Sequence, residues 1–166
     1  MDDNGTASLL LPLPMRLALD LARAAASEGE VPVGAVIMRG DRVIATAANR
    51  MRVSLDPTAH AEMDAIRTAA SLLGNERLDE CDLWVTLEPC AMCAGAISHA
   101  RIKRLYYAAG DPKGGGVDHG PRLAGVVARG VDRDPRFDRE SRVAGVTELL
   151  VATSEAQVAC VRNIGF

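Results

Sequence analysis

Aromatic residues and long hydrophobic runs are both scarce in this sequence. Phe, Trp and Tyr make up 3% of its 166 residues, so aliphatic side chains must fill the core. No segment reaches the roughly 18 continuous apolar residues of a membrane-spanning helix, and we therefore expect no membrane span. The apolar run near the N-terminus follows an acidic start, whereas a secretory signal starts with basic residues. We accordingly expect a cytoplasmic protein.

The chain also lacks an excess of positive charge. Its formal net charge is -3 and its pI is about 5.6, so nothing in the overall charge favours a nucleic-acid partner. Such a partner would need a local basic patch, for which the best candidates are Arg101, Lys103, Arg104 and Lys113. The 48% hydrophobic content nevertheless suffices for one compact domain with a real core.

Cysteine is rare as well, with four residues in the chain. In a chain without an export signal, such a small number indicates free thiols or a metal site rather than a disulfide framework.

Apolar periodicity and turn residues divide the chain into three parts. We expect an N-terminal extension (1–14), a folded domain (15–122) and an atypical tail (123–166). The elements predicted within the domain are a helix at 15–27, a hairpin of strands at 31–38 and 43–49, a loop at 50–57, a helix at 58–73, a strand at 82–87, a helix at 91–100 and a strand at 101–109. This order predicts an α/β fold with a mixed sheet and helices on its faces.

The tail has a different texture. Residues 123–142 are mostly Arg, Asp, Gly and Val without a clear period, and 146–161 offers one more apolar element. The abrupt change suggests the hypothesis of a shifted reading frame near residue 122. Translating the other two frames of the gene beyond that codon tests it.

The stretch "PCAMC" (89–93) predicts half of a metal site. Cys90 and Cys93 are three residues apart, so on a short helix both thiols face the same side. Pro89 suits a helix start, and the positive end of the helix dipole there favours the thiolate. Two thiolates need a further ligand, and zinc accepts an imidazole nitrogen readily.

His60 is the predicted third ligand, and Glu62 stands beside it at the start of another helix. Three protein ligands leave a position for water, as in catalytic zinc sites, whereas structural sites have four. Cys81 is excluded as a fourth ligand, because the strand at 82–87 would separate it from Cys90 by about 20 Å. Cys160 stays possible.

An open zinc site predicts hydrolytic chemistry. Zinc lowers the pKa of a bound water toward about 7. An adjacent carboxylate can take the proton of that water and deliver it elsewhere, which is the role expected for Glu62. The combination H-x-E followed by P-C-x-x-C is the signature of zinc nucleobase deaminases.

Longer strings narrow the resemblance. Those that resemble bacterial tRNA-specific adenosine deaminases are "EVPVGAVI" (30–37), "NR" (49–50), "DPTAHAEMDAIR" (56–67), "LWVTLEPCAMCAGAISHARIKRL" (83–105) and "GDPK" (110–113). The resemblance covers roughly residues 15–122. It implies a three-layer α/β/α, cytidine deaminase-like fold, a homodimer, and conversion of the wobble adenosine of an anticodon loop to inosine.

The resemblance also assigns roles by position. It implies one zinc ion per subunit on His60, Cys90 and Cys93, with Glu62 as the proton shuttle. Asn49 matches a residue that hydrogen-bonds the target nucleoside, although it could merely close the hairpin. Asp111 and Lys113 match the loop that lines the RNA groove. We expect His99 to be a helix-end residue and His119 to be inert.

The tail departs from this family, whose final aromatic-rich helix helps to contact RNA. Residues 123–166 do not resemble that helix. Two alternatives therefore stay open. The protein could deaminate a free base or nucleoside such as guanine or cytosine, or it could be a zinc-binding protein whose altered C-terminus has cost it activity.

Overall fold

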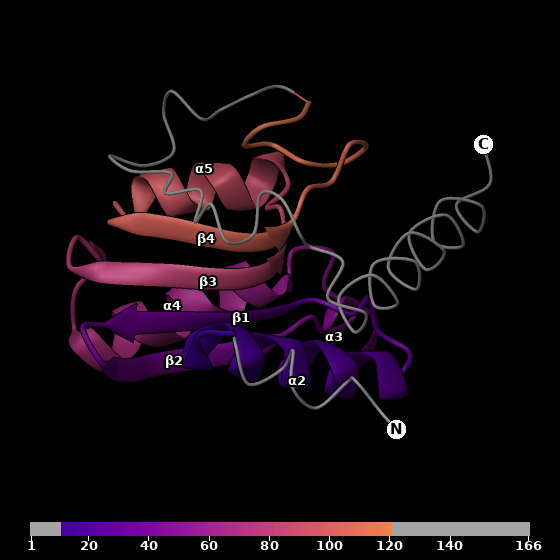
Figure 1. Cartoon of the computed structure of the whole chain (residues 1–166), viewed down its shortest axis with the longest axis horizontal. Helices are drawn as coiled ribbons and strands as arrows, with labels where there is room; N and C mark the ends of the chain where they lie inside the picture. Colours follow the sequence, from indigo (N-terminus) through magenta and orange to yellow (C-terminus); the bar gives the residue numbers. More distant parts are fainter. Residues whose placement is uncertain (1–10, 121–166) are drawn as a thin grey trace.

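The structure, a computed structural model, describes residues 11–120 (Figure 1). Its elements along the chain are α2 (Leu13–Ser27), β1 (Gly34–Arg39), β2 (Arg42–Ala48), α3 (Met51–Ser54), α4 (Ala61–Leu73), β3 (Cys81–Leu87), α5 (Ala91–His99) and β4 (Arg104–Ala109). The predictions for the tail, including the reading-frame hypothesis, and most of the N-terminal extension lie outside the described residues. No helix within 11–120 is long and apolar enough to cross a membrane.

The four strands form one mixed sheet in the order β2-β1-β3-β4. β1 pairs antiparallel with both β2 and β3, whereas β3 and β4 are parallel. The parallel pair needs a crossover, and α5 supplies it. The predicted hairpin is confirmed, with Arg39 paired to Arg42 across its turn.

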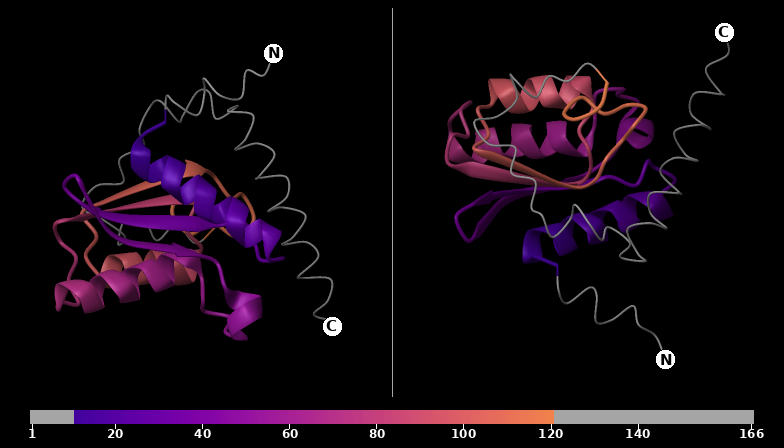
Figure 2. Two further views of the ribbon diagram at one scale, coloured as in Figure 1. Left: turned by 90° about the horizontal axis from the view of Figure 1, so that it is seen from below. Right: turned by 45° about the horizontal axis from the view of Figure 1, so that its top comes forward.

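Helices cover both faces of the sheet. α2 lies on one face, and α4 and α5 lie side by side on the other (Figure 2). Because both faces are covered, the central strands are buried on both sides, as the near-continuous apolar runs in the sequence require. The expected three-layer α/β/α architecture is confirmed.

α4 shows why its sequence forms this helix. Ala61, Ala65 and Ala69 recur every four residues and are fully buried, so small side chains let the helix pack closely on the sheet. The helix ends at Gly74, whose φ of 62° is left-handed and therefore suits glycine.

Several element boundaries differ from the prediction, and β1 and α4 each begin three residues later than expected, at Gly34 and Ala61. α2 begins at Leu13, two residues earlier than expected, and β4 begins at Arg104 rather than at 101. The segment at 50–57 is not entirely a loop, because Met51–Ser54 form the short helix α3. None of its side chains is buried, so the sequence shows no apolar period there. The helix is stabilised by hydrogen bonds from its backbone N–H groups to the distant Glu30.

The topology brings several chain segments to one edge of the sheet. Since β1 is antiparallel to its neighbours, the residues before β1 lie beside those that follow β2 and β3. β4, parallel to β3, ends at the same edge. We call this edge the site edge, because His60 and Cys90 also begin their helices there.

Candidate metal centre and active site

The predicted metal ligands come together at the starts of two helices. His60 is the N-cap residue of α4, Cys90 is the N-cap residue of α5, and Cys93 lies in the first turn of α5. The candidate ligand atoms of these three residues all lie within 4.8 Å of one another. Among residues 11–120, these three side chains form a group that could hold a metal ion.

The distances fit a tetrahedral zinc ion. Nδ1 of His60 lies 3.7 Å from Sγ of Cys90 and 3.5 Å from Sγ of Cys93. With ordinary Zn–S and Zn–N bond lengths, a tetrahedral ion separates a sulfur and a nitrogen ligand by about 3.6 Å. One imidazole and two thiols also form a donor set that zinc prefers. The cluster is therefore consistent with the zinc site that is typical of deaminases.

The local environment prepares Cys90 to be a ligand. The neighbouring Cys93 thiol and His60 stabilise its thiolate and lower the pKa of Cys90 to about 4. The interaction with Cys90 raises the pKa of Cys93, and the same Cys90 thiolate raises the pKa of His60. A bound metal ion would replace the protons on these groups.

Glu62 lies in the first turn of α4 and is 4% exposed. Burial raises the pKa of Glu62 to about 7. A carboxyl group of this kind can take up and release a proton near neutral pH, which is what a general acid and base requires. A divalent cation beside it would lower that pKa.

Cys81 does not take part in the cluster. It is the first residue of β3, at the opposite end of the strand from Cys90, and is 1% exposed. Burial raises the pKa of Cys81, as expected of a small apolar residue in a core. The prediction that this thiol is not a ligand agrees with the cluster, whereas Cys160 lies outside the described residues.

Glu88, which the sequence interpretation missed, organises the loop after β4. Its side chain is fully buried. Oε1 accepts the backbone N–H groups of Val117, Asp118 and His119, and Oε2 accepts that of Asp111. Burial opposes ionisation of Glu88, but the backbone N–H groups of Asp111, His119 and Asp118 outweigh it and lower its pKa to about 2.

The glycines of this loop allow it to lie directly against the segment that contains Cys90. Gly115 forms an isolated bridge with Cys90, and the N–H of Gly116 donates to the Pro89 carbonyl at 2.8 Å. A Cβ on Gly115 would lie 2.5 Å from the Glu88 carboxyl group, and one on Gly116 would lie 2.7 Å from the Ala91 backbone. "KGGG" is therefore a close-packing segment beside Cys90.

Asp111 and Lys113 lie in this loop but differ in exposure. Asp111 is 8% exposed, and its Oδ1 accepts the N–H groups of Lys113 and Gly114, each at 3.0 Å. Its carboxylate thus shapes the turn. The Lys113 side chain is exposed on the same turn.

His119 is more closely involved than expected. Its Nδ1 lies 2.6 Å from Oε2 of Glu88, a contact that the sequence interpretation did not foresee, and the absence of a chemical role for His119 stays a prediction. The sequence carried no signal for this pair, since the two residues are 31 positions apart. His99 is exposed at the end of α5, as expected.

Asn49 follows β2 and lies next to a residue that is hydrogen-bonded to the segment before His60. The N–H of the next residue, Arg50, donates to the carbonyl of Ala59, directly before His60. Asn49 is 4% exposed, and its Nδ2 lies 3.3 Å from Oε2 of Glu30. Glu30, also 4% exposed, is a second buried carboxylate that the sequence interpretation missed.

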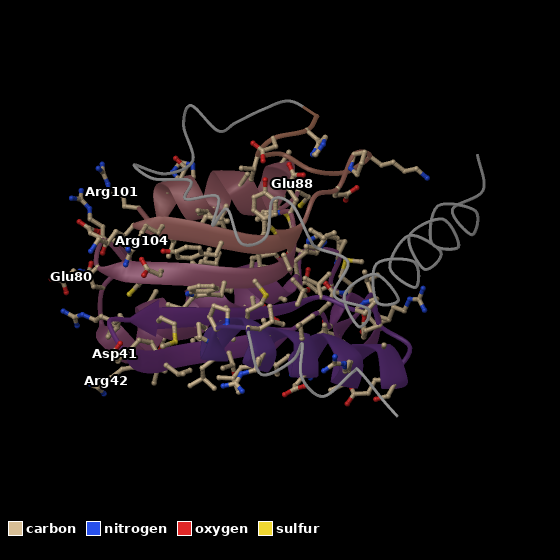
Figure 3. The ribbon with its side chains drawn as sticks, in the orientation of Figure 1. Asp41, Arg42, Glu80, Glu88, Arg101 and Arg104 are labelled. Carbon is tan, nitrogen blue, oxygen red and sulfur yellow. The ribbon has the colours of Figure 1, made fainter. Side chains whose placement is uncertain are left out.

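Most of the predicted basic patch lies elsewhere. Figure 3 shows Arg101 and Arg104 at the end of the sheet opposite Glu88. Arg104 forms a two-pronged ion pair with Asp82, with contacts of 2.7 and 3.0 Å. Arg101 and Arg104 therefore lie at the other end of the sheet from the loop that Glu88 organises, and a role of these residues in binding a polyanion stays a prediction. Of the four candidates, Lys113 lies at the site edge.

The fold and the cluster together are those of the zinc-dependent nucleobase deaminases. The chain belongs to the MafB19-like deaminase family, whose model matches residues 13–163. Within that class it stands with the tRNA-specific adenosine deaminases. It is 59% identical over 109 residues to the tRNA-specific adenosine deaminase of Agrobacterium fabrum, an alignment that covers 66% of this chain and 72% of that protein.

Two solved structures of deaminases are similar to this chain. One, described for A-to-I editing by tRNA:A34 deaminases at the wobble position, is 58% identical with a TM-score of 0.66, covering 67% of this chain and 85% of the other. A guanine deaminase from Bacillus subtilis is 44% identical with a TM-score of 0.56, covering 58% of this chain and 62% of the other. These pairwise matches cover 58% to 67% of the chain, whereas the family model continues to residue 163.

Proposed function

We propose that this protein is a zinc-dependent tRNA adenosine deaminase that converts the wobble adenosine of an anticodon loop to inosine. The observation that carries the proposal is the His60, Cys90 and Cys93 cluster beside the buried Glu62, in a chain 59% identical to a tRNA-specific adenosine deaminase. A substrate of this kind agrees with the cytoplasmic location that we expect from the sequence.

The protein's own residues account for the proton movements. His60, Cys90 and Cys93 would hold one zinc ion, which would supply the Lewis acidity that activates water. Glu62 would take the first proton of the attacking water and deliver it to N1 of adenine as C6 gains the oxygen. It would then take the second proton and deliver it to the departing amine. One water is consumed and one ammonia released. The water-poor surroundings of Glu62 strengthen these transfers.

A loop substrate suits the site edge. A base in a single-stranded loop can be swung out at a cost of a few kcal/mol and read in a pocket. Asn49 contacts the target nucleoside. Asp111 shapes the turn that carries Lys113, and the exposed Lys113 side chain meets a phosphate.

A homodimer would bring further basic residues to the RNA. α5 is the proposed interface, because it is rich in small residues and Met92 on it is 37% exposed. A Cβ on Gly95 would meet nothing within 4 Å in this chain, so the helix offers an open, close-packing surface. A Met92→Glu variant should shift the protein toward the monomer in sedimentation analysis, and an unchanged dimer would contradict this interface.

The second candidate is a guanine deaminase, favoured by the 44% identity to the Bacillus subtilis enzyme. Its metal chemistry would be identical. Incubating the purified protein with unmodified arginine tRNA and, separately, with guanine, cytosine and adenosine distinguishes the candidates. We expect inosine in the tRNA. Consumption of a free base without inosine in the tRNA would exclude the first function, and no turnover on any substrate would favour a non-catalytic zinc protein.

A further inference from the structure

Glu30 and Asn49 form a buried pair at the site edge. Glu30 precedes β1 and Asn49 follows β2, so the antiparallel pairing of these strands brings the two side chains together. Oε1 of Glu30 accepts the backbone N–H groups of Arg52 and Val53, each at 2.9 Å. Oε2 is left for Nδ2 of Asn49, at 3.3 Å. The two oxygens of the Glu30 carboxylate therefore accept from different partners, Oε1 from the backbone of α3 and Oε2 from Asn49.

This pair decides the orientation of the Asn49 amide. An asparagine side chain has a donor end and an acceptor end of nearly the same shape, so its orientation follows from its hydrogen bonds. An ionised carboxylate only accepts, so the NH₂ end must face Glu30. The oxygen Oδ1 then faces the other way. Within residues 11–120, Oδ1 has no hydrogen-bond partner.

We propose that Glu30 is a positioning residue that holds the Asn49 amide with its acceptor oxygen toward the substrate, so that this position selects a nucleoside presenting an N–H or O–H donor. The inference rests on the proposed function, because it takes Asn49 as a substrate contact. It adds the reason why the contact has one polarity. Asn49 presents its acceptor oxygen to the substrate, and its NH₂ group is turned toward Glu30.

The structure also provides a way to invert this polarity. In a Glu30→Gln variant, the N–H groups of Arg52 and Val53 still require an acceptor, so the Gln carbonyl takes the place of Oε1. The Gln NH₂ then takes the place of Oε2 and faces Asn49. Asn49 must turn its oxygen toward this donor, which presents its NH₂ end to the substrate.

A second substitution should restore the original pattern. Asn49→Asp alone places two carboxylates within hydrogen-bonding distance and should also impair binding. In the double variant, the Gln NH₂ donates to one oxygen of the aspartate, and the other oxygen again presents an acceptor. The double variant has the same net charge as the wild type and nearly the same volume.

The test measures kcat and KM for deamination of an arginine tRNA anticodon stem-loop, together with its Kd in a Glu62→Gln background. Each single variant should raise KM and Kd by about 10- to 100-fold, because a polar group facing the wrong partner in a buried site loses this much. The double variant should recover most of the loss. Glu30→Gln should keep its zinc content and unfolding temperature, and Glu80→Gln, at the far end of the sheet, is the matched control.

A stem-loop with 2′-deoxyadenosine at the target position identifies the donor. If the donor is the sugar hydroxyl, the effect of Glu30→Gln should disappear on this RNA, and if it is a group of the base, the effect should persist. A Glu30→Gln variant that binds like wild type, or a double variant no better than the singles, would overturn the role of Glu30 while leaving the proposed function intact. A wild type that makes no inosine would overturn the proposed function itself.

Discussion

β3 has a glutamate just before it and another just after it, and the two lie in opposite environments. The side chain of Glu80 is 69% exposed and pairs with Arg39, whereas that of Glu88 is fully buried among backbone N–H groups. Surface ion pairs contribute little to stability, and a buried carboxylate is tolerated only when its oxygens are satisfied. The same residue type therefore forms an exposed ion pair at one end of the sheet and holds the loop after β4 at the other.

The cysteines at the two ends of β3 differ in a similar way. Cys81 begins the strand in the core, and Cys90 follows it at the site edge with a pKa lowered to about 4. What separates the two ends is that two helix starts meet at the site edge and bring Cys93 and His60 beside Cys90, where they stabilise its thiolate. The difference teaches that position relative to helix termini, rather than residue type, decides which groups carry chemistry.

The largest difference should appear when the two cysteines are each replaced by alanine. Cys90→Ala removes a thiolate ligand, so we expect it to lose stoichiometric zinc and all measurable deamination. Cys81→Ala removes a small buried group, so it should keep zinc and activity while losing about 1 kcal/mol of unfolding free energy. Metal analysis and inosine formation measure both, and zinc retained by Cys90→Ala would rule out the proposed ligand set.

Glu62→Gln should give the next largest effect. Gln has nearly the shape of Glu but cannot shuttle a proton, so kcat should fall by about 10²- to 10⁴-fold. Zinc content and Kd for the anticodon stem-loop should change little, because the metal ligands and the substrate contacts are intact. Single-turnover rates report the chemical step directly. A rate within about tenfold of wild type would assign the proton transfer to another group.

Glu88→Gln tests the organising role of the buried glutamate. The Gln carbonyl can still accept from Val117, Asp118 and His119, but its NH₂ would face the N–H of Asp111. Such a mispaired buried donor should cost about 2–4 kcal/mol of unfolding free energy. Thermal unfolding of the zinc-loaded protein should shift by roughly 5–15 °C. An unchanged midpoint would show that the loop is held by other contacts.

The sequence predicted the elements that local patterns determine. Apolar spacing marked α4 and placed its end at residue 73, where the structure ends it. The short, two-part signature with His60 and Cys90 predicted the cluster, because each half places its side chains at a helix start and the alternation of strands and helices brings those starts to one edge. These features depend on residues close together in the chain, so they could be read from it.

The features that the sequence did not predict depend on distant contacts. α3 has no apolar period, and its N–H groups are satisfied by Glu30, more than 20 residues earlier. Glu88 resembles any polar residue after a strand until the loop at 111–119 folds over it. The placement of Arg101 and Arg104 away from the site follows from strand direction, which composition does not reveal.

The smallest effect is expected from Glu80→Gln, which completes the comparison with Glu88. Arg39 and Glu80 are 50% and 69% exposed, so water already screens their attraction and each side chain loses freedom when they pair. The substitution should change the free energy of unfolding by less than about 0.5 kcal/mol, and that change should vanish at high salt. Urea unfolding at low and high ionic strength measures it. A loss approaching that of Glu88→Gln would mean that the far end of the sheet is stabilised by charge pairing after all, and that burial alone does not separate the two ends of β3.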